Sequence, residues 1–209
     1  MVATPPPLVT RARRYTRPAK LLHWLMAILV LSQIAVALAM EAAPKDSVEQ
    51  MEFFRWHASL GVAILLLWPL RVLWRLTHTP PPLPHTIPAV QGFIARQTHY
   101  WMYVLLLLLP LTGWAVISTP APADATLLIG GFLLPPMPGA ELLAALLQSV
   151  GIAKIGHAHV WLAWTLVVLI TLHVAAAALH HFVLRDDVLL RILPYSWHPL
   201  CNRLRGCRY

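Results

Sequence analysis

Apolar residues in this chain gather in long uncharged runs rather than at alternating positions or in a narrow stripe. The runs cover residues 21–40, 56–70 with an extension past Arg71 to residue 74, 100–117, and 160–179. Each is long enough, or nearly so, for the about 20 residues that cross the hydrocarbon of a bilayer as a helix. No stretch alternates like a soluble strand, and irregular backbone cannot face lipid. The pattern therefore predicts an all-α fold, a transmembrane four-helix bundle.

The connections between these runs differ in kind. Residues 77–88 hold five prolines, which predict a stiff, extended link. Residues 118–156 form a longer connection, and leucines at 142, 143, 146 and 147 predict a short amphipathic helix over residues 140–150 that lies in the membrane interface. This connection either caps a site at its end of the bundle or simply packs there.

Basic residues are distributed unevenly between the two sides of the predicted bundle. The chain is 58% hydrophobic and 11% charged, with a net charge of +8, and thirteen of its 16 Lys and Arg fall on one side, leaving Lys45, Arg55 and Lys154 on the other. The positive-inside rule then predicts that both termini are cytoplasmic. Because the basic residues do not form one patch, nucleic-acid binding is not expected.

The same pattern divides the chain into a basic N-terminal segment (1–20), a four-span domain (21–183) and a basic C-terminal tail (184–209). A cleavable signal peptide over the first run is the competing interpretation, but the run is about twice the usual length. Cys201 and Cys207 lie in the tail on the reducing side, where a structural disulfide is not expected. Acidic residues collect on the opposite side, at positions 41, 46, 49, 52, 124 and 141.

His159 and His173 lie fourteen residues apart within the fourth run. At 100° per residue they share one helix face to within ~40° and stand ~21 Å apart along the axis. Ionisable side chains in hydrocarbon are costly and need a partner, so a stacked pair is a candidate functional site. We expect haem iron as that partner, at two depths. Matching depths across helices pairs His57 with His159 and His23 with His173, so that each pair grips a flat porphyrin from two helices.

Three further histidines lie at or near the ends of the predicted helices. His157 lies ~160° around the helix from His173, which indicates an interfacial histidine or one with a proton or substrate role. His180 lies on the His173 face near the inner surface and could border a quinone pocket. His99 lies at the inner level, where it either replaces His23 as a ligand or is a polar residue of the interface.

The sequence resembles the bacterial cytochrome b561 family of four-span dihaem cytochromes, over about Arg14 to Pro194. The resemblance is carried by Arg14-Tyr15-Thr16, His23-Trp24, His57-Ala58-Ser59-Leu60-Gly61 with Arg71 and Arg75, His99 with Pro110 and Gly113, and Leu172-His173 followed by alanines to His180-His181 and then Leu189-Leu190-Arg191. It implies two haem b groups, with His23, His57, His159 and His173 at the family's ligand positions. The chain departs from the pattern in its long outer loop, in its tail, and at Ala158, where the family has an aromatic residue.

The resemblance also implies a function. Close relatives act as superoxide oxidases of the bacterial inner membrane, taking an electron from superoxide at the outer face and reducing ubiquinone. Lys45, Arg55 and Lys154 could then steer an anion inward, although nearby carboxylates oppose a strong positive field. Arg71 and Arg75 are expected either to pair with haem propionates or to mark a helix end. The sequence assigns no catalytic residue.

Two alternatives remain. In the first, the protein oxidises quinol and delivers electrons to a small periplasmic redox protein. In the second, it is a histidine-lined metal transporter without haem, which would need a polar path through its centre.

Overall fold

A computed structural model of the chain describes residues 14–82, 87–119, 126–151, 154–194 and 197. Cys201, Cys207 and Asp124 lie outside the described residues, as do residues 1–13 of the predicted N-terminal segment and 198–209 of the predicted tail. The expectations about the two cysteines therefore stay predictions.

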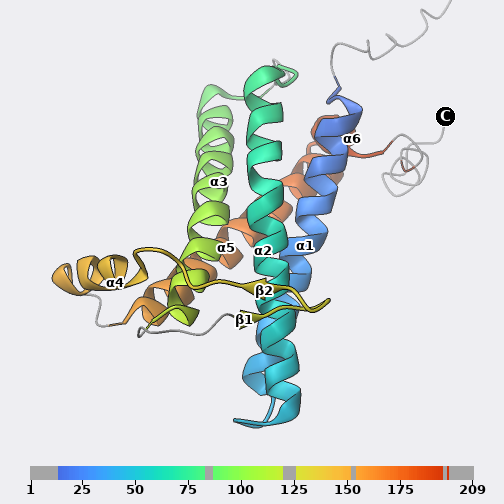
Figure 1. Ribbon diagram of the computed structural model, residues 1–209. Helices are drawn as coiled ribbons and strands as arrows, with labels where there is room; N and C mark the ends of the chain where they lie inside the picture. The colour runs from blue at the N-terminus through green and yellow to red at the C-terminus, as the bar shows by residue number, and fades with distance from the viewer. Residues whose placement is uncertain (1–13, 83–86, 120–125, 152–153, 195–196, 198–209) are drawn as a thin grey trace, which may run out of the picture.

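Most of the described chain is helical (Figure 1). Four helices are long and apolar enough to cross a membrane, as the four apolar runs predicted. They are α1 (Arg17–Ala42), α2 (Val48–Thr77), α3 (Ala89–Ile117) and α5 (Ile155–Ala178), and α5 continues into a π-helical turn, η2 (Leu179–Val183).

Local sequence explains where the first two helices begin. The Thr16 side chain accepts a hydrogen bond from Ala19 N, and Pro18 lies in the first turn of α1, where its missing N–H costs nothing. Ser47 caps α2 in the same way by accepting from Gln50 N at 3.0 Å. Pro69 and Pro110 lie inside α2 and α3, a position that neighbouring helices make tolerable in membrane proteins.

The connection between α3 and α5 contains the predicted short helix, α4 (Ala140–Ser149), and also a small β-hairpin that the all-α prediction did not include. Strands β1 (Thr126–Leu127) and β2 (Leu133–Leu134) pair antiparallel. Gly130 and Gly131 connect them with φ angles of 85° and 82°, a backbone conformation that glycine adopts without strain. The two glycines thus allow a tight turn within an apolar segment. The strands have only two residues each, too few to give an alternating pattern in the sequence.

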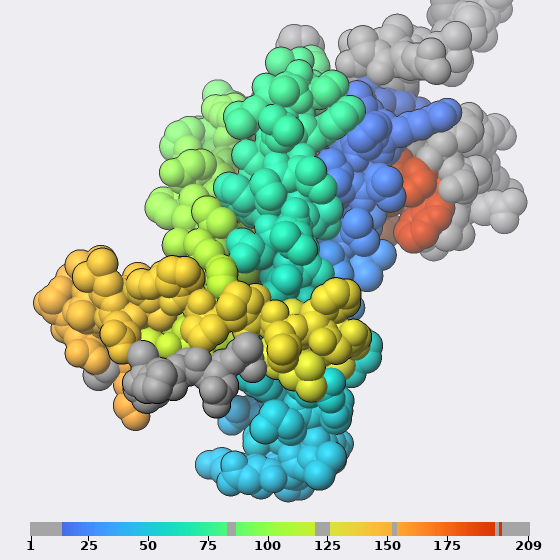
Figure 2. Space-filling model, in the orientation of Figure 1, coloured from blue at the N-terminus to red at the C-terminus, as the bar shows by residue number. Residues whose placement is uncertain are grey.

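The hairpin lies across the outside of α2, as the yellow band in Figure 2 shows. Ile129 N donates to Ser59 Oγ at 2.9 Å, and the Trp114 indole of α3 donates to Pro135 O at 2.8 Å. Ser59 lies ~160° around α2 from His57, so this contact packs the loop against the far face of the helix. The hairpin therefore joins α2 to α3 rather than capping the His57 side chain.

The long helices pack mainly as α1 against α2 and α3 against α5, with α2 and α3 joining the two pairs. The central apolar core is small and takes residues from all four helices: Met26, Val30, Ile64, Leu67, Leu105 and Leu166. Many large apolar side chains face outwards instead, among them Leu66 and Trp161, which are 68% and 75% exposed. Such a surface suits hydrocarbon as the surrounding solvent.

Candidate functional site

Polar side chains form two layers, one on each side of the central apolar core. We call the end at which α1 begins the basic end, after Arg17, Lys20, Arg75, Arg96 and Arg185, and the opposite end the acidic end, after Glu41, Asp46, Glu49, Glu52 and Glu141. Each long helix contributes one side chain to each layer. The layer nearer the basic end contains His23, Arg71, His99 and His173, and the layer nearer the acidic end contains Gln33, His57, Thr112 and His159.

At the basic end three imidazoles meet. The ring centroids of His23 and His173 are 6.5 Å apart, and those of His99 and His173 are 5.0 Å apart. Arg71 is half-buried here: its guanidinium donates a hydrogen bond to His23 Nδ1 at 3.1 Å and lies 5.6 Å from the centre of the Tyr103 ring. The depth matching that paired His23 with His173 thus agrees with their proximity, and His99 is a third neighbour.

The hydrogen bonds distinguish His23 from His99. A guanidinium can only donate, so His23 Nδ1 accepts from Arg71, and a neutral His23 carries its proton on Nε2. His99 Nδ1 donates to Ala95 O at 2.7 Å, which leaves the lone pair on its Nε2. Ligation by His23 Nε2 therefore requires Arg71 to release Nδ1, whereas His99 already has the protonation pattern of a metal ligand.

At the acidic end His57 and His159 face each other, with ring centroids 6.2 Å apart and planes at 79°. The Thr112 hydroxyl has one proton, which it donates to a backbone carbonyl of its own helix, Leu108 O at 2.9 Å or Leu109 O at 3.0 Å. It must therefore accept from His159 Nδ1, at 3.0 Å. This bond leaves the lone pair of His159 on Nε2, the arrangement that metal-binding histidines commonly have.

His57 is held from the other side by Gln33, whose amide Nε2 lies 3.1 Å from His57 Nε2. Because the amide nitrogen only donates, His57 Nε2 accepts and its Nδ1 carries the proton. Among the described residues, His57 Nδ1 and Gln33 Oε1 are buried without a hydrogen-bond partner. Buried polar atoms of this kind are costly, which suggests that another polar group completes this layer.

Gly113 lets the His159 ring approach α3 closely. A Cβ atom at this position would lie 3.2 Å from His159 Cε1, a tight contact. At Gly61, by contrast, a Cβ would lie 3.7 Å from Gln33 Nε2, an ordinary contact. The absence of a side chain at Gly113 therefore leaves the room that the His159 ring needs.

These two layers suit iron held between imidazoles. Metal–nitrogen bonds to imidazole are about 2 Å long, so two rings on opposite sides of one iron have centroids about 6 Å apart. The separations of 6.2 Å for His57–His159 and 6.5 Å for His23–His173 match this spacing, and the 5.0 Å of His99–His173 is shorter than it. Two neutral imidazoles are also the donor set of low-spin b-type cytochromes. The residues present thus fit haem.

The other residues that the sequence singled out lie apart from the two layers. Arg75 and Lys45 are exposed, and Arg55 forms an ion pair with Glu52 at 2.8 Å. His180, in the π-helical turn, is half-buried and hydrogen bonded to Asp186.

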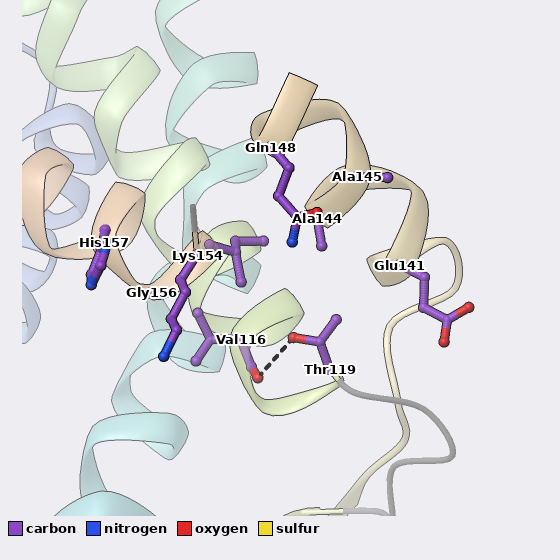
Figure 3. A pocket seen from close by; sticks show the side chains of 10 residues that line it. Val116, Thr119, Glu141, Ala144, Ala145, Gln148, Lys154, Gly156 and His157 are labelled. Carbon is purple, nitrogen blue, oxygen red and sulfur yellow. Dashed lines mark hydrogen bonds between the residues drawn. The ribbon is translucent and has the colours of Figure 1, made fainter. Parts of the chain in front are cut away.

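His157 is exposed and lines a cavity of about 560 Å³ between the end of α3, α4 and the start of α5 (Figure 3). Lys154, Gln148 and Glu141 also line this cavity. His157 therefore does not share the layer of His159, in agreement with the helix geometry that separated the two.

Sequence reasoning missed Gln33 and Thr112, the partners of the two histidines at the acidic end. Gln33 is an uncharged polar residue in the middle of an apolar run, ten residues after His23, and Thr112 precedes Gly113 in the third run. The depth matching that paired the histidines would have placed both at the level of His57 and His159, had it been applied to all polar residues within the spans.

Comparison with known proteins assigns the chain to a family. Residues 14–195 match the profile of prokaryotic cytochrome b561. The chain belongs to the prokaryotic cytochrome b561 family. It is 33% identical over 186 residues to cytochrome b561 homolog 2 of Escherichia coli, which covers 88% of this chain and 93% of that protein. It is 32% identical over 175 residues to the probable superoxide oxidase CybB of Yersinia pestis, and the matched region is 83% of this chain and 92% of that protein.

A third relative, cytochrome b561 homolog 1 of Escherichia coli, is 26% identical over 185 residues, or 87% of this chain and 97% of that protein. Family membership implies b-type haem and membrane electron transfer. Together with the four apolar helices, it indicates a bacterial multi-pass membrane protein.

Proposed function

We propose that this cytochrome binds two haem b groups, one between His57 and His159 and one between His23 and His173, and that it passes electrons from superoxide to ubiquinone. The observation that carries the proposal is the pair of imidazoles in each polar layer, each pair drawn from two helices with ring centroids 6.2 and 6.5 Å apart. Held between two imidazoles, each haem would supply one-electron transfer and would have no site free for direct O₂ binding.

The chain's own side chains have distinct parts in this proposal. Thr112 fixes the tautomer of His159, and Gln33 fixes that of His57 with the lone pair on Nε2. For His57 Nε2 to hold iron, the Gln33 amide would have to release it. Arg71 is the only cation in either layer among the described residues, and its release from His23 would free it to pair with a haem propionate. Arg75, being exposed, is the weaker candidate for that pairing.

The balance of the overall reaction is simple. Each superoxide loses one electron and becomes dioxygen, and ubiquinone takes up two electrons and two protons to become ubiquinol. We place superoxide at the acidic end and the cytoplasm at the basic end, with both termini there, following the positive-inside rule. His180, with its Asp186 partner near the basic end, is the candidate border of the quinone site.

The central apolar core argues against the transporter alternative. Met26, Ile64, Leu105 and Leu166 separate the two polar layers, so the described residues offer an ion no continuous polar path. Reduced-minus-oxidised visible spectra of the purified protein test this point directly, because a transporter without haem gives no cytochrome bands.

The deciding experiment for the substrate is a superoxide pulse. We expect stopped-flow mixing with superoxide to produce the reduced cytochrome spectrum, and ubiquinone to reoxidise it afterwards. Superoxide dismutase added before mixing should abolish the first phase. A cytochrome that stays oxidised under the pulse but is reduced by ubiquinol would contradict superoxide oxidation.

That outcome would favour the second candidate function, a quinol-oxidising cytochrome that delivers electrons to a periplasmic redox protein. One observation supports it: the α1–α2 end carries four carboxylates, Glu41, Asp46, Glu49 and Glu52, which suit a basic protein partner better than an anion.

A further inference from the structure

At the basic end, the segment after α5 folds back against α1 and accepts hydrogen bonds from residues on both sides of His23 in the sequence. It contains α6 (Val188–Ile192), which lies beside α1 in Figure 1. Lys20 Nζ donates to Leu193 O at 2.8 Å, and the Trp24 indole donates to Ile192 O at 3.1 Å. Lys20 lies one turn before His23 and Trp24 directly after it, so two consecutive carbonyls of this segment hold the turn of α1 that carries the histidine.

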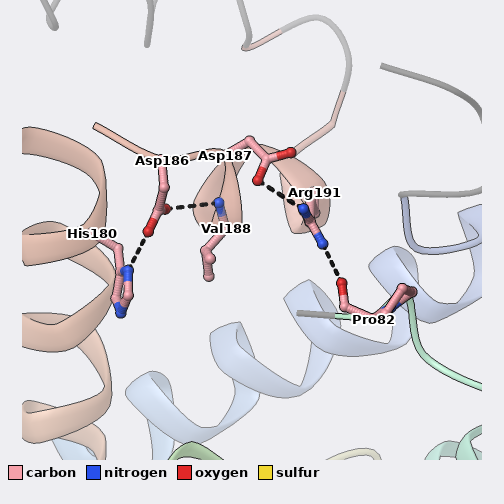
Figure 4. Close-up of polar contacts among 6 residues, drawn as sticks. All are labelled: Pro82, His180, Asp186, Asp187, Val188 and Arg191. Atoms are coloured by element: carbon pink, nitrogen blue, oxygen red, sulfur yellow. Dashed lines mark hydrogen bonds and ion pairs between the residues drawn. The ribbon is translucent and has the colours of Figure 1, made fainter. Parts of the chain in front are cut away.

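The other end of the segment is fixed to α5, the helix that carries His173. Figure 4 shows His180 hydrogen bonded to Asp186, whose second carboxylate oxygen accepts from Val188 N at 3.0 Å. Asp186 N also donates to His180 O at 3.1 Å. The start of α6 is therefore attached to η2, the π-helical turn that continues α5.

Arg191 holds the segment in place from a third direction. Its guanidinium forms an ion pair with Asp187 at 2.9 Å and donates to Pro82 O, in the link between α2 and α3, at 2.5 Å (Figure 4). Arg191 is only 6% exposed and Leu193 only 4%. A buried, paired guanidinium is costly to displace, so the segment cannot shift without losing these contacts.

This arrangement matters because α1 and α5 have little direct packing within the described residues, although His23 and His173 lie on them. Besides the indirect path through α2 and α3, the segment 184–194, which we call the brace, links the two helices at the basic end. On the proposed function, we infer that Trp24 and Arg191 are positioning residues, which act through the brace to set the separation and angle of the His23–His173 pair around its haem.

The test is Trp24→Phe in the full-length, haem-loaded protein. This change keeps an aromatic ring beside His23 but replaces the indole by a smaller phenyl ring and so removes the N–H that binds Ile192 O. The low-spin EPR signal and the midpoint potential of each haem are measured, and His159→Ala identifies which signal belongs to the His23–His173 pair. We expect the signal and potential of that haem to shift while the other haem stays at its wild-type values. That haem should also transfer several-fold faster to excess apomyoglobin.

Trp114→Phe is the matched control, because it also removes one indole-to-carbonyl bond, to Pro135 at 2.8 Å, but at the acidic end. It should leave the haem of the basic end unchanged. Arg191→Lys keeps the charge and cannot make both Arg191 contacts, so it should reproduce the Trp24→Phe shift; should it fail to fold, Trp24→Phe alone decides.

Two distinct failures are possible. Two haems with wild-type signals in Trp24→Phe would overturn the positioning role and leave the proposed function intact. Fewer than two haems in the wild-type protein would overturn the ligand assignment, and this inference with it.

Discussion

At the scale of single residues, two histidines in one turn of α5 have different surroundings. His159 is half-buried, contacts Thr112 and faces His57, whereas His157 is exposed at the rim of a cavity. We expect His159→Ala to lose one of two haems and His157→Ala to keep both, because only the first removes a nitrogen from a paired layer. Pyridine haemochrome analysis per polypeptide measures this. Two haems in His159→Ala would refute the pairing.

Thr112 allows a finer test of the same layer. Its hydroxyl accepts a hydrogen bond from His159 Nδ1, which makes the imidazole a stronger electron donor and favours oxidised iron. Thr112→Val should therefore raise the midpoint potential of one haem. A bond of about 1 kcal/mol corresponds to a shift of roughly 40 mV for one electron. Thr112→Ser, which retains the hydroxyl, should stay near wild type in the same redox titration, and equal shifts in both variants would exclude the hydrogen bond as the cause.

At the scale of elements, α4 presents two different faces. Leu142, Leu146 and Val150 are 76%, 61% and 69% exposed, whereas Leu143 and Leu147 pack against the cluster of Ala115, Ala140 and Ile155. This distribution indicates that the exposed leucines face lipid.

A nitroxide label tests the orientation of α4 in a variant without Cys201 and Cys207. At position 146 the label should collide more with oxygen, which partitions into the bilayer. At position 148, where Gln148 lines the cavity, it should collide more with a water-soluble nickel chelate. Power-saturation EPR in liposomes measures both. Equal nickel accessibility at the two positions would mean that α4 stands clear of the membrane.

The elements that the sequence predicted are those whose signal is local. Four apolar runs predicted four long helices, and the spacing of His159 and His173 predicted two levels on one face. The brace could not be predicted, since Trp24 and Ile192 are 168 residues apart and meet through a backbone carbonyl that has no sequence signature. The helix spacing that put His180 on the His173 face assumed a regular α-helix, whereas that turn is π-helical.

At the scale of the whole molecule, each layer takes one polar side chain from every long helix, and the apolar core lies between the layers. Water and ions therefore meet an apolar barrier. Electrons can tunnel through such a barrier, over distances that an ion cannot tunnel. On the proposed function, substrates would react at the two ends, so the charges at each end would influence what can approach.

The charges at the acidic end predict that salt raises the rate of reduction by superoxide, whereas simple steering of an anion by basic residues would predict that salt lowers it. Its described residues include five carboxylates and three basic side chains, and one of the latter, Arg55, is paired with Glu52. On the proposed function, superoxide would approach a net negative surface, and screening of that surface by salt should speed its approach. Between about 0.01 and 0.15 M salt the Debye length falls from about 30 to 8 Å, and we expect the rate of cytochrome reduction by superoxide to rise about two-fold.

The local cations can be separated from this overall field. Lys154 lines the cavity beside His157, whereas Lys45 is exposed in the turn between α1 and α2, and Lys154→Gln and Lys45→Gln make the same change in charge. If the net field governs approach, both variants slow the stopped-flow rate by a similar small factor at low salt, and the difference fades as salt is added. A rate that falls with salt, together with a loss confined to Lys154→Gln, would instead mean that superoxide enters along the cavity under the attraction of that one lysine.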